Sequence, residues 1–456
     1  GCLYEEHSQE EASHGTPCIG GVKGMTQRIL IVLGLSLVLG SCWADDLERE
    51  PILYSKSEPE NIISGLQERL RQGTAQLPYR DEDGYLRGVL AELQIPLSSQ
   101  VLVFSKTSLQ RGRISPKTPR AIYFNDDVYV GFCLHGHVME ISVADSKLGT
   151  VFYTIEQERR KQPVIQRQTD NCLVCHASSY NHGLPGHLVR SVFPDRQGEP
   201  QLASGSYRTD QTSKFSERWG GWYVTGTHGQ QKHMGNQCYA RNGDAVDESL
   251  QTQNVTDLSQ HFTTGLYPTP HSDLIALMVL EHQAIMHNRL ARALLETRQA
   301  LYYQEDLNKA FTEKPGTLFD STRRRLDSVA DEVVKYMLFS QEAKLTEPVK
   351  GTSEFAREFS ERGPFDKQGR SLRQLDLQTR LFKYPCSYLI YTRTFDDLPT
   401  IIRDRILDKL LAVLDGKYTT PAFQHLTPAD RQAIKEILVE TKQSLPASWR
   451  KTGSSP

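Results

Sequence analysis

Cysteine is scarce in this chain, with eight residues in 456. They fall into three groups: Cys2, Cys18 and Cys42 before residue 45, the pair Cys172 and Cys175, and Cys133, Cys238 and Cys386 elsewhere. Small secreted domains that rely on disulfides have a far higher cysteine content. The sequence therefore excludes a disulfide framework and allows at most one bridge among the last three cysteines.

Strong charge and long apolar runs are also lacking. The formal net charge is −2, and the calculated pI is near 6.8. This balance gives no electrostatic signature for binding nucleic acid or an anionic membrane surface. The apolar run at residues 29–40 spans only twelve residues, whereas a membrane-spanning helix needs about 20.

That apolar run has the pattern of an export signal. It follows Met25 and the positive charge of Arg28, as in the signal peptides of secreted proteins. We expect Met25 to be the true start, with the polar residues 1–24 a gene-start artefact. Residues 1–44 are thus an upstream extension and a signal peptide. The mature protein is expected to be exported to the periplasm or cell envelope.

Two cleavage sites fit the end of this signal. The stretch 39–42, Leu-Gly-Ser-Cys, resembles the lipobox of bacterial lipoproteins, in which a lipid attached to Cys42 would tether the chain to a membrane. Alternatively, a signal peptidase could cut after Ala44. The sequence leaves this choice open.

The remaining chain predicts an α+β fold with a β-rich N-terminal part, a loop-rich cytochrome c-like segment and a helical C-terminal part. Residues 45–98 read as a linker with short helices at 58–72 and 81–94, and residues 99–160 as β-rich. Strands are expected at 100–108, 120–134, 137–145 and 149–157. Residues 161–270 are rich in Gly, His and aromatics. Residues 271–456 predict helices at 272–300, 317–343, 397–415 and 428–443, the first capped by Ser272 and the last by Thr427.

The most specific motif is Cys172-Leu-Val-Cys175-His176, a C-x-x-C-H sequence. In c-type haem attachment, two thiols one helical turn apart add to the vinyl groups of the porphyrin, and the following histidine binds the iron. A structural zinc site commonly needs a second C-x-x-C pair, which the sequence lacks. A thioredoxin-like dithiol would need a βαβ frame, which the flanking residues do not indicate. The motif predicts one covalent haem c held by Cys172, Cys175 and His176.

The wider chain resembles a group of long, exported bacterial proteins with a single haem c and no settled role. The resemblance is carried by NCLVCHASS, RSVFPDRQGEP, RWGGWYVTGTHGQQKHMGN, LMVLEHQAIMHN and RLFKYPCSYLIY. It covers most of residues 100–445, although only the haem motif has defined chemistry. The chain is much longer than a small, all-helical cytochrome c, which puts in doubt a simple mobile-carrier role.

The second axial ligand of the iron is less certain from sequence. Met234 follows His176 by 58 residues, a separation similar to that between the two ligands of small cytochromes c, so we predict Met234 as a metal ligand. His233, His228 and the helix at 278–287, with Glu281 and His282, are the alternatives. Arg218 or Arg190 could pair with haem propionates. One of His182 and His187 could also hydrogen-bond a propionate, although an ordinary hydrogen-bonded loop histidine is the commoner outcome.

Two functions remain open. A six-coordinate haem predicts one-electron transfer with an exported redox partner protein. An open distal site predicts a haem enzyme, peroxidase-like or acting on another small molecule, with a histidine moving protons. No substrate motif appears, so electron transfer is the primary expectation, and whether the chain is an enzyme is left open.

Overall fold

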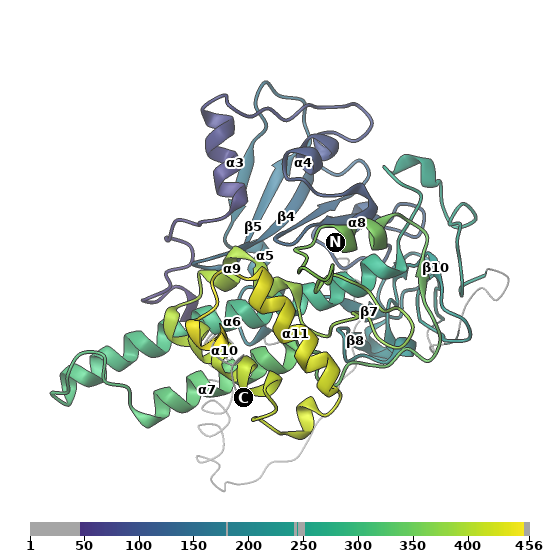
Figure 1. Cartoon of the computed structure of the whole chain (residues 1–456). Coiled ribbons are helices and arrows are strands. Elements are labelled where there is room, and N and C mark those ends of the chain that lie inside the picture. The colour runs from purple at the N-terminus through teal and green to yellow at the C-terminus, as the bar shows by residue number, and fades with distance from the viewer. Residues whose placement is uncertain (1–45, 179–180, 241–243, 245–250, 451–456) are drawn as a thin grey trace, which may run out of the picture. The chain divides into compact units, whose positions relative to one another are not determined.

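An antiparallel sheet of seven strands dominates the first part of the fold (Figure 1). The computed structural model describes residues 46–178, 181–240, 244 and 251–450. The strands lie in the order β6-β5-β4-β3-β2-β1-β9, each antiparallel to its neighbours. Their bounds are β1 (Val101–Val103), β2 (Arg120–Phe124), β3 (Val128–Phe132), β4 (Val138–Asp145), β5 (Gly149–Glu156), β6 (Ile165–Gln168) and β9 (Trp222–Tyr223).

The sheet agrees with the strands predicted from the sequence, with shorter bounds. The run 120–134 is divided into β2 and β3 by an Asx turn, in which Asn125 Oδ1 accepts hydrogen bonds from Asp127 N and Val128 N. Only three residues of the predicted run 100–108, Val101–Val103, form a strand. The chain leaves the sheet after Val103 because the next two backbone amides donate to Gly221 O instead.

Helices make up the C-terminal part, as predicted, so the fold is α+β. The helices are α3 (Ile62–Arg71), α4 (Leu86–Glu92), α5 (Asn171–His176), α6 (Leu274–Ala310), α7 (Asp320–Met337), α8 (Phe355–Glu361), α9 (Arg393–Asp396), α10 (Thr400–Leu414) and α11 (Pro428–Thr441). Two short strand pairs, β7 (Arg190–Val192) with β8 (Ser206–Arg208) and β10 (Gly226–Thr227) with β11 (Lys350–Gly351), join the loop-rich segments. Thr427 caps α11 in a capping box with Asp430, as predicted.

The prediction that Ser272 caps the long helix α6 was wrong by one residue. Asp273 is the N-cap, and its Oδ1 accepts hydrogen bonds from the amides of Ile275 and Ala276. Ser272 Oγ instead donates to Tyr223 O at 2.6 Å and accepts from Leu102 N at 2.8 Å. Its hydroxyl thus joins β1 and β9 at the point where α6 begins.

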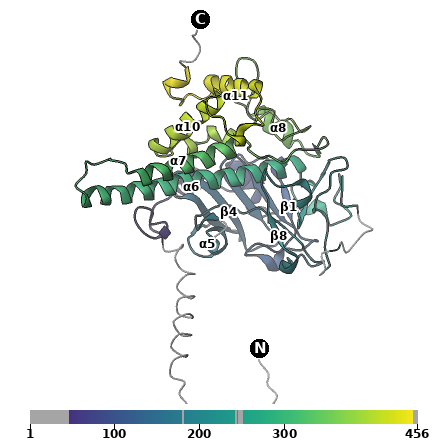
Figure 2. The same cartoon turned by 90° about the horizontal axis from the view of Figure 1, so that it is seen from below.

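The helices α6 and α7 form a layer between the sheet and the C-terminal helices (Figure 2). The helix α6 contacts β5 on one side and α7 and α10 on the other. Residues from Leu47 onward form one unit, and a single hydrophobic cluster runs through it from Leu47 to Trp449. Burial of such a continuous apolar surface is the main stabilising contribution.

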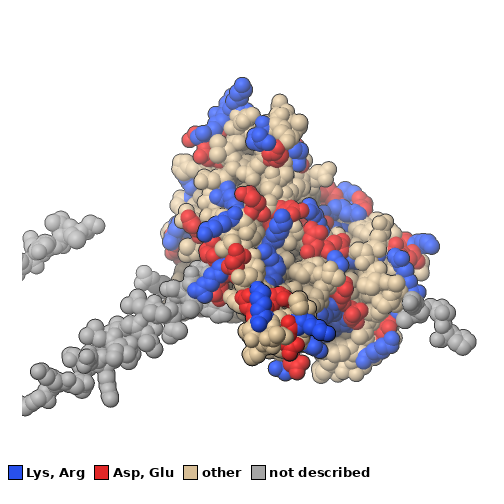
Figure 3. All heavy atoms as spheres, turned by 90° about the vertical axis from the view of Figure 1, so that its left-hand side faces the viewer, with Lys and Arg blue, Asp and Glu red and all other residues tan. Residues whose placement is uncertain are grey.

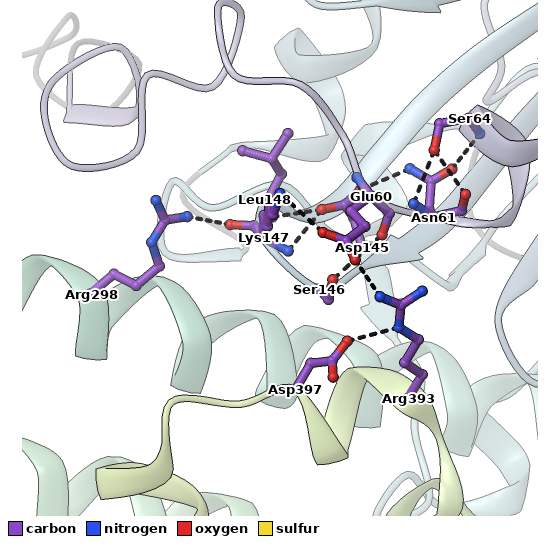
Figure 4. Close-up of polar contacts among 10 residues, drawn as sticks. All are labelled: Glu60, Asn61, Ser64, Asp145, Ser146, Lys147, Leu148, Arg298, Arg393 and Asp397. Atoms are coloured by element: carbon purple, nitrogen blue, oxygen red, sulfur yellow. Dashed lines mark hydrogen bonds and ion pairs between the residues drawn. The ribbon is translucent and has the colours of Figure 1, made fainter. Parts of the chain in front are cut away.

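The segment before α3 is attached to the rest of this unit by a polar cluster around Asp145 (Figure 4). The buried Asp145 carboxylate accepts four hydrogen bonds, from Glu60 N, Asn61 Nδ2, Lys147 N and Leu148 N, at 2.7–2.9 Å. Glu60 in turn forms ion pairs with Lys147 and with Arg393 of α9. The cluster therefore connects the segment before α3 to the β4–β5 turn and to the C-terminal helices.

The substitution Asp145→Asn is expected to destabilise the fold. The amide nitrogen it introduces cannot accept the hydrogen bonds from Glu60 N and Asn61 Nδ2. An unsatisfied buried donor costs about 1–3 kcal/mol, so we expect a loss of that size in the free energy of unfolding in urea. Ser146→Ala in the same turn is the control, because the Ser146 hydroxyl forms only a 3.5 Å contact with Glu60 O. Equal stabilities of the two variants would contradict this account of Asp145.

The surface is mixed in charge on the side where the α6–α7 hairpin extends. Acidic and basic side chains are interspersed over this face (Figure 3). Among the residues that the structure describes, none of the helices combines the length and apolar character that crossing a bilayer requires. The predicted signal segment, Met25 and Cys42 lie outside the described residues.

Candidate cofactor site

The C-x-x-C-H motif forms the short helix α5, which follows β6. Cys172 and Cys175 are three positions apart on this single turn, so their side chains lie on neighbouring positions of one helix face. Both are free thiols, Cys172 half-buried and Cys175 exposed, and both line the same cavity. Burial raises the pKa of the Cys172 thiol to about 11. The helix thus presents two unpaired thiols to one cavity.

His176 ends α5 with its ring held in a defined orientation. Its Nδ1 lies 2.8 Å from Gly186 O, and since a carbonyl only accepts, Nδ1 carries the proton. The ring packs on Phe152 of β5 with centroids 4.8 Å apart. Burial lowers the pKa of His176, which favours the neutral ring. The lone pair of Nε2 is therefore available, the arrangement that metal-binding histidines use.

The loop from His176 to His187 is held in place by two asparagines. Asn181 Nδ2 donates to the backbone carbonyls of His176 and His187. Asn288 of α6 donates to Asn181 Oδ1 and His187 O, and its Oδ1 accepts from His187 N at 2.7 Å. The carbonyl of Gly186 that orients His176 is thereby fixed to the long helix.

Gly186 lies too close to α6 to tolerate a side chain. A Cβ at this position would lie 2.5 Å from Asn288 Oδ1. We expect Gly186→Ala to displace the loop and lower the free energy of unfolding by about 1–3 kcal/mol, as overpacking does. Gly265→Ala is the matched control, because a Cβ there meets nothing within 4 Å. A thermal unfolding comparison in which the two variants agree would contradict this role of Gly186.

The cavity that Cys172, Cys175 and His176 line has a volume of about 460 Å³ and lies on one face of the sheet. Two rows of paired strand residues form its floor, because antiparallel partners on alternate positions share a face. The rows are Ile122–Gly131–Glu140 and Tyr129–Ser142–Phe152. Leu188, Val189 and Trp222, with Leu280 and Ala284 of α6, add further apolar walls.

Basic side chains gather at this cavity. Lys106, Arg111 and Arg120 are among the lining residues. Arg120 lies across Gly131 and pairs with Glu140, while its buried Nε has no hydrogen-bond partner among the described residues. Lys106 and Arg111 share Glu199 at 3.2 and 2.7 Å. Three cations and two carboxylates leave an excess of positive charge beside an apolar space.

These residues fit a haem c. The volume lies within the range of about 300–1,000 Å³ typical of cofactor pockets. Apolar walls suit the porphyrin faces, the two thiols and the imidazole suit covalent attachment and iron ligation, and the unpartnered Arg120 Nε suits an anionic propionate. The donor set and its surroundings therefore agree with the group that the motif predicts.

The structure does not bring Met234 to this cavity. Its sulfur accepts a hydrogen bond from Ser191 Oγ at 3.5 Å, and Met234 is not among the lining residues. His228 and His233 pack on each other and on Phe215, also away from the cavity. Met234 as an iron ligand thus remains a sequence prediction without geometric support.

The predicted contributions of the long helix and the arginines also differ from expectation. Arg218 forms a buried ion pair with Glu281 of α6 at 2.8 Å, and Arg190 donates to Ser206 Oγ. His282 is bonded to Gln211 and Ser387. None of these side chains lines the cavity. The helix α6 contributes Leu280 and Ala284 instead, because these residues lie on its sheet-facing side.

His187 is the one of the two candidate loop histidines that the structure places among the cavity-lining residues. It lines the cavity, is only 6% exposed, and packs on Tyr129 with ring centroids 4.3 Å apart. Its Nε2 lies 3.0 Å from Ser142 Oγ, and its Nδ1 has no partner among the described residues. Burial lowers its pKa well below the usual value, and the nearby His176 and His287 add to this.

The described residues contain no group of three or more His, Cys, Asp or Glu side chains placed to hold a metal ion. No family model, curated protein or solved structure is detectably similar to this chain.

Proposed function

We propose that the chain holds one covalent haem c at Cys172 and Cys175, with His176 as the axial ligand. The observation that carries the proposal is the 2.8 Å contact between His176 Nδ1 and Gly186 O, next to the two free thiols. It leaves Nε2 unprotonated, with the lone pair that a metal-binding histidine needs. Arg120, Lys106 and Arg111 would hold the propionates.

We further propose that this group serves one-electron transfer with an exported redox partner protein. The haem would supply a one-electron couple at the iron. The attachment helix has no buried residue, and Val174 between the two cysteines is 78% exposed. A cofactor attached there lies next to the surface, where a partner can approach it. Export and a lipid tether at Cys42 belong to this proposal.

A haem enzyme is the second candidate, and the buried His187 favours it. An imidazole with an unpartnered Nδ1 at the cavity wall is suited to proton transfer. The hydroxyl of Tyr129, which also lines the cavity, lies 2.9 Å from Nδ1 of a second buried histidine, His287. Peroxidase-like chemistry would use such side chains on a small molecule in the cavity.

Addition of carbon monoxide to the reduced protein separates the two candidates. Electron transfer at a six-coordinate iron predicts a one-electron titration curve and a reduced spectrum unaffected by carbon monoxide, although none of the second ligands predicted from the sequence lines the cavity. A spectrum that shifts with carbon monoxide would reveal an open coordination position and replace electron transfer by the enzyme proposal.

A further inference from the structure

A line of buried polar groups runs from the cavity wall toward the polar cluster around Asp145. Tyr129 lines the cavity, and its hydroxyl lies 2.9 Å from His287 Nδ1. His287 belongs to α6 and is only 3% exposed. Its other nitrogen, Nε2, has no hydrogen-bond partner among the described residues. An unpartnered buried nitrogen carries a desolvation cost unless another molecule satisfies it.

A small void lies beside His287, separate from the cavity that Tyr129 lines. It measures about 10 Å³ and is lined by His287, Asp145, Thr394 and the small residues Gly149 and Ala291, among others. This is the lower limit of the space that one water molecule occupies, about 10–15 Å³, and three of the lining residues, His287, Asp145 and Thr394, have polar side chains. Beyond the void, Asp145 bonds to Glu60 N and Asn61 at the edge of the fold (Figure 4).

We propose that His287 takes up one proton when a haem held in the cavity receives one electron, and that this proton arrives from solvent through the void beside Asp145. The inference rests on the proposed function. The electron comes from the redox partner protein, the proton comes from water, and both leave again on oxidation. The added negative charge in the cavity is thus balanced by a positive charge on His287 Nε2.

The surroundings of His287 determine how readily its imidazole ring is protonated. Burial lowers its pKa to about 4, while the negative charge of the nearby Asp126 favours the protonated ring. The other titratable groups near it are Tyr129 on β3, Asp145 at the β4–β5 turn, His187 in the motif loop, and His282 on its own helix. Reduction of the cavity group raises the pKa of His287 through added negative charge.

The test is the midpoint potential of the haem-loaded protein as a function of pH. Reduction binds a proton only between the two pKa values of His287, so the potential falls as pH rises from about 4 and levels off above the reduced-state pKa. The full slope for one proton per electron is about 59 mV per pH unit. His287→Gln is expected to flatten this slope.

His228→Gln is the matched control, because His228 is a buried histidine away from both cavity and void. It should keep the slope. Asp127, whose pKa burial raises to about 6, titrates alike in both variants. A flat wild-type profile with haem attached, or an unchanged slope in His287→Gln, would overturn the inference. A wild-type chain without covalent haem would instead overturn the proposed function on which the inference depends.

Nitrogen-15 NMR of the histidine rings measures the protonation state of His287 directly, in the wild-type protein. At about pH 5, just above the pKa of about 4, His287 Nε2 should gain a proton on reduction of the wild-type protein. A His287 ring that stays neutral in both redox states would contradict the proposal.

Discussion

Replacing both Cys172 and Cys175 by alanine is expected to remove all covalently bound haem from the exported protein. Each thiol supplies one thioether bond, and the cavity has no other cysteine among its lining residues. Haem stain on a denaturing gel should fall to background, while the amount of protein changes little because α5 has no buried residue. The single variant Cys175→Ala should retain a weaker signal from one remaining bond.

The control for this experiment is Cys238→Ala, a half-buried cysteine outside the cavity. Its haem stain should match the wild type. Persistence of the stain in the double variant would mean that haem is attached elsewhere, and loss of the stain in the control would indicate a general failure of maturation or folding.

The second large effect is expected from Glu281→Leu. Glu281 and Arg218 form an ion pair in which both side chains are at most 5% exposed. Burial raises the pKa of Glu281 to about 7, and Arg218 opposes this shift. Removing the carboxylate leaves the Arg218 guanidinium buried without its charged partner. Breaking a buried pair in this way costs about 3–5 kcal/mol.

Chemical denaturation measures this loss as a shift in the unfolding midpoint with an unchanged slope. Glu281→Gln should lose less, because its amide oxygen still accepts a hydrogen bond from Arg218. The pair joins the segment leading into β9, whose Trp222 lines the cavity, to α6. A Glu281→Leu variant as stable as the wild type would show that Arg218 is satisfied by Ser213 O and Gln211 O alone.

The fold was predictable wherever the residue pattern is local. The period-two runs at 137–145 and 149–157 became β4 and β5, and Thr427-Pro428 began α11. Ser272 was mistaken for the cap of α6 because local sequence cannot reveal that its hydroxyl bonds to Leu102 and Tyr223, residues far away in the chain. Strand order, and the placing of α6 against β5, likewise depend on long-range packing.

The candidate site was likewise predictable only where its residues are close together in the sequence. The spacing of Cys172, Cys175 and His176 sets their relation on one helical turn, so the motif alone is enough to predict where a haem would be attached. The cavity around it is assembled from β2 to β5 and from α6, and no separation along the chain identifies Arg120 as a member, whereas His187 was a candidate because it follows His176 closely. One available signal was the polar residues Arg120, Glu140 and Ser142 at inward positions of apolar strands. Counting 58 residues from His176 favoured Met234, but folding places its sulfur beside Ser191.

The most direct test of the account is the visible spectrum of the protein exported from a host that can mature c-type cytochromes, recorded before and after acid-acetone extraction. Covalent haem c predicts a Soret band that stays with the chain through extraction. On adding dithionite, this band should shift and the separate α and β bands of the reduced haem should appear. A chain without a Soret band, or one whose haem passes into the solvent, would contradict attachment at Cys172 and Cys175.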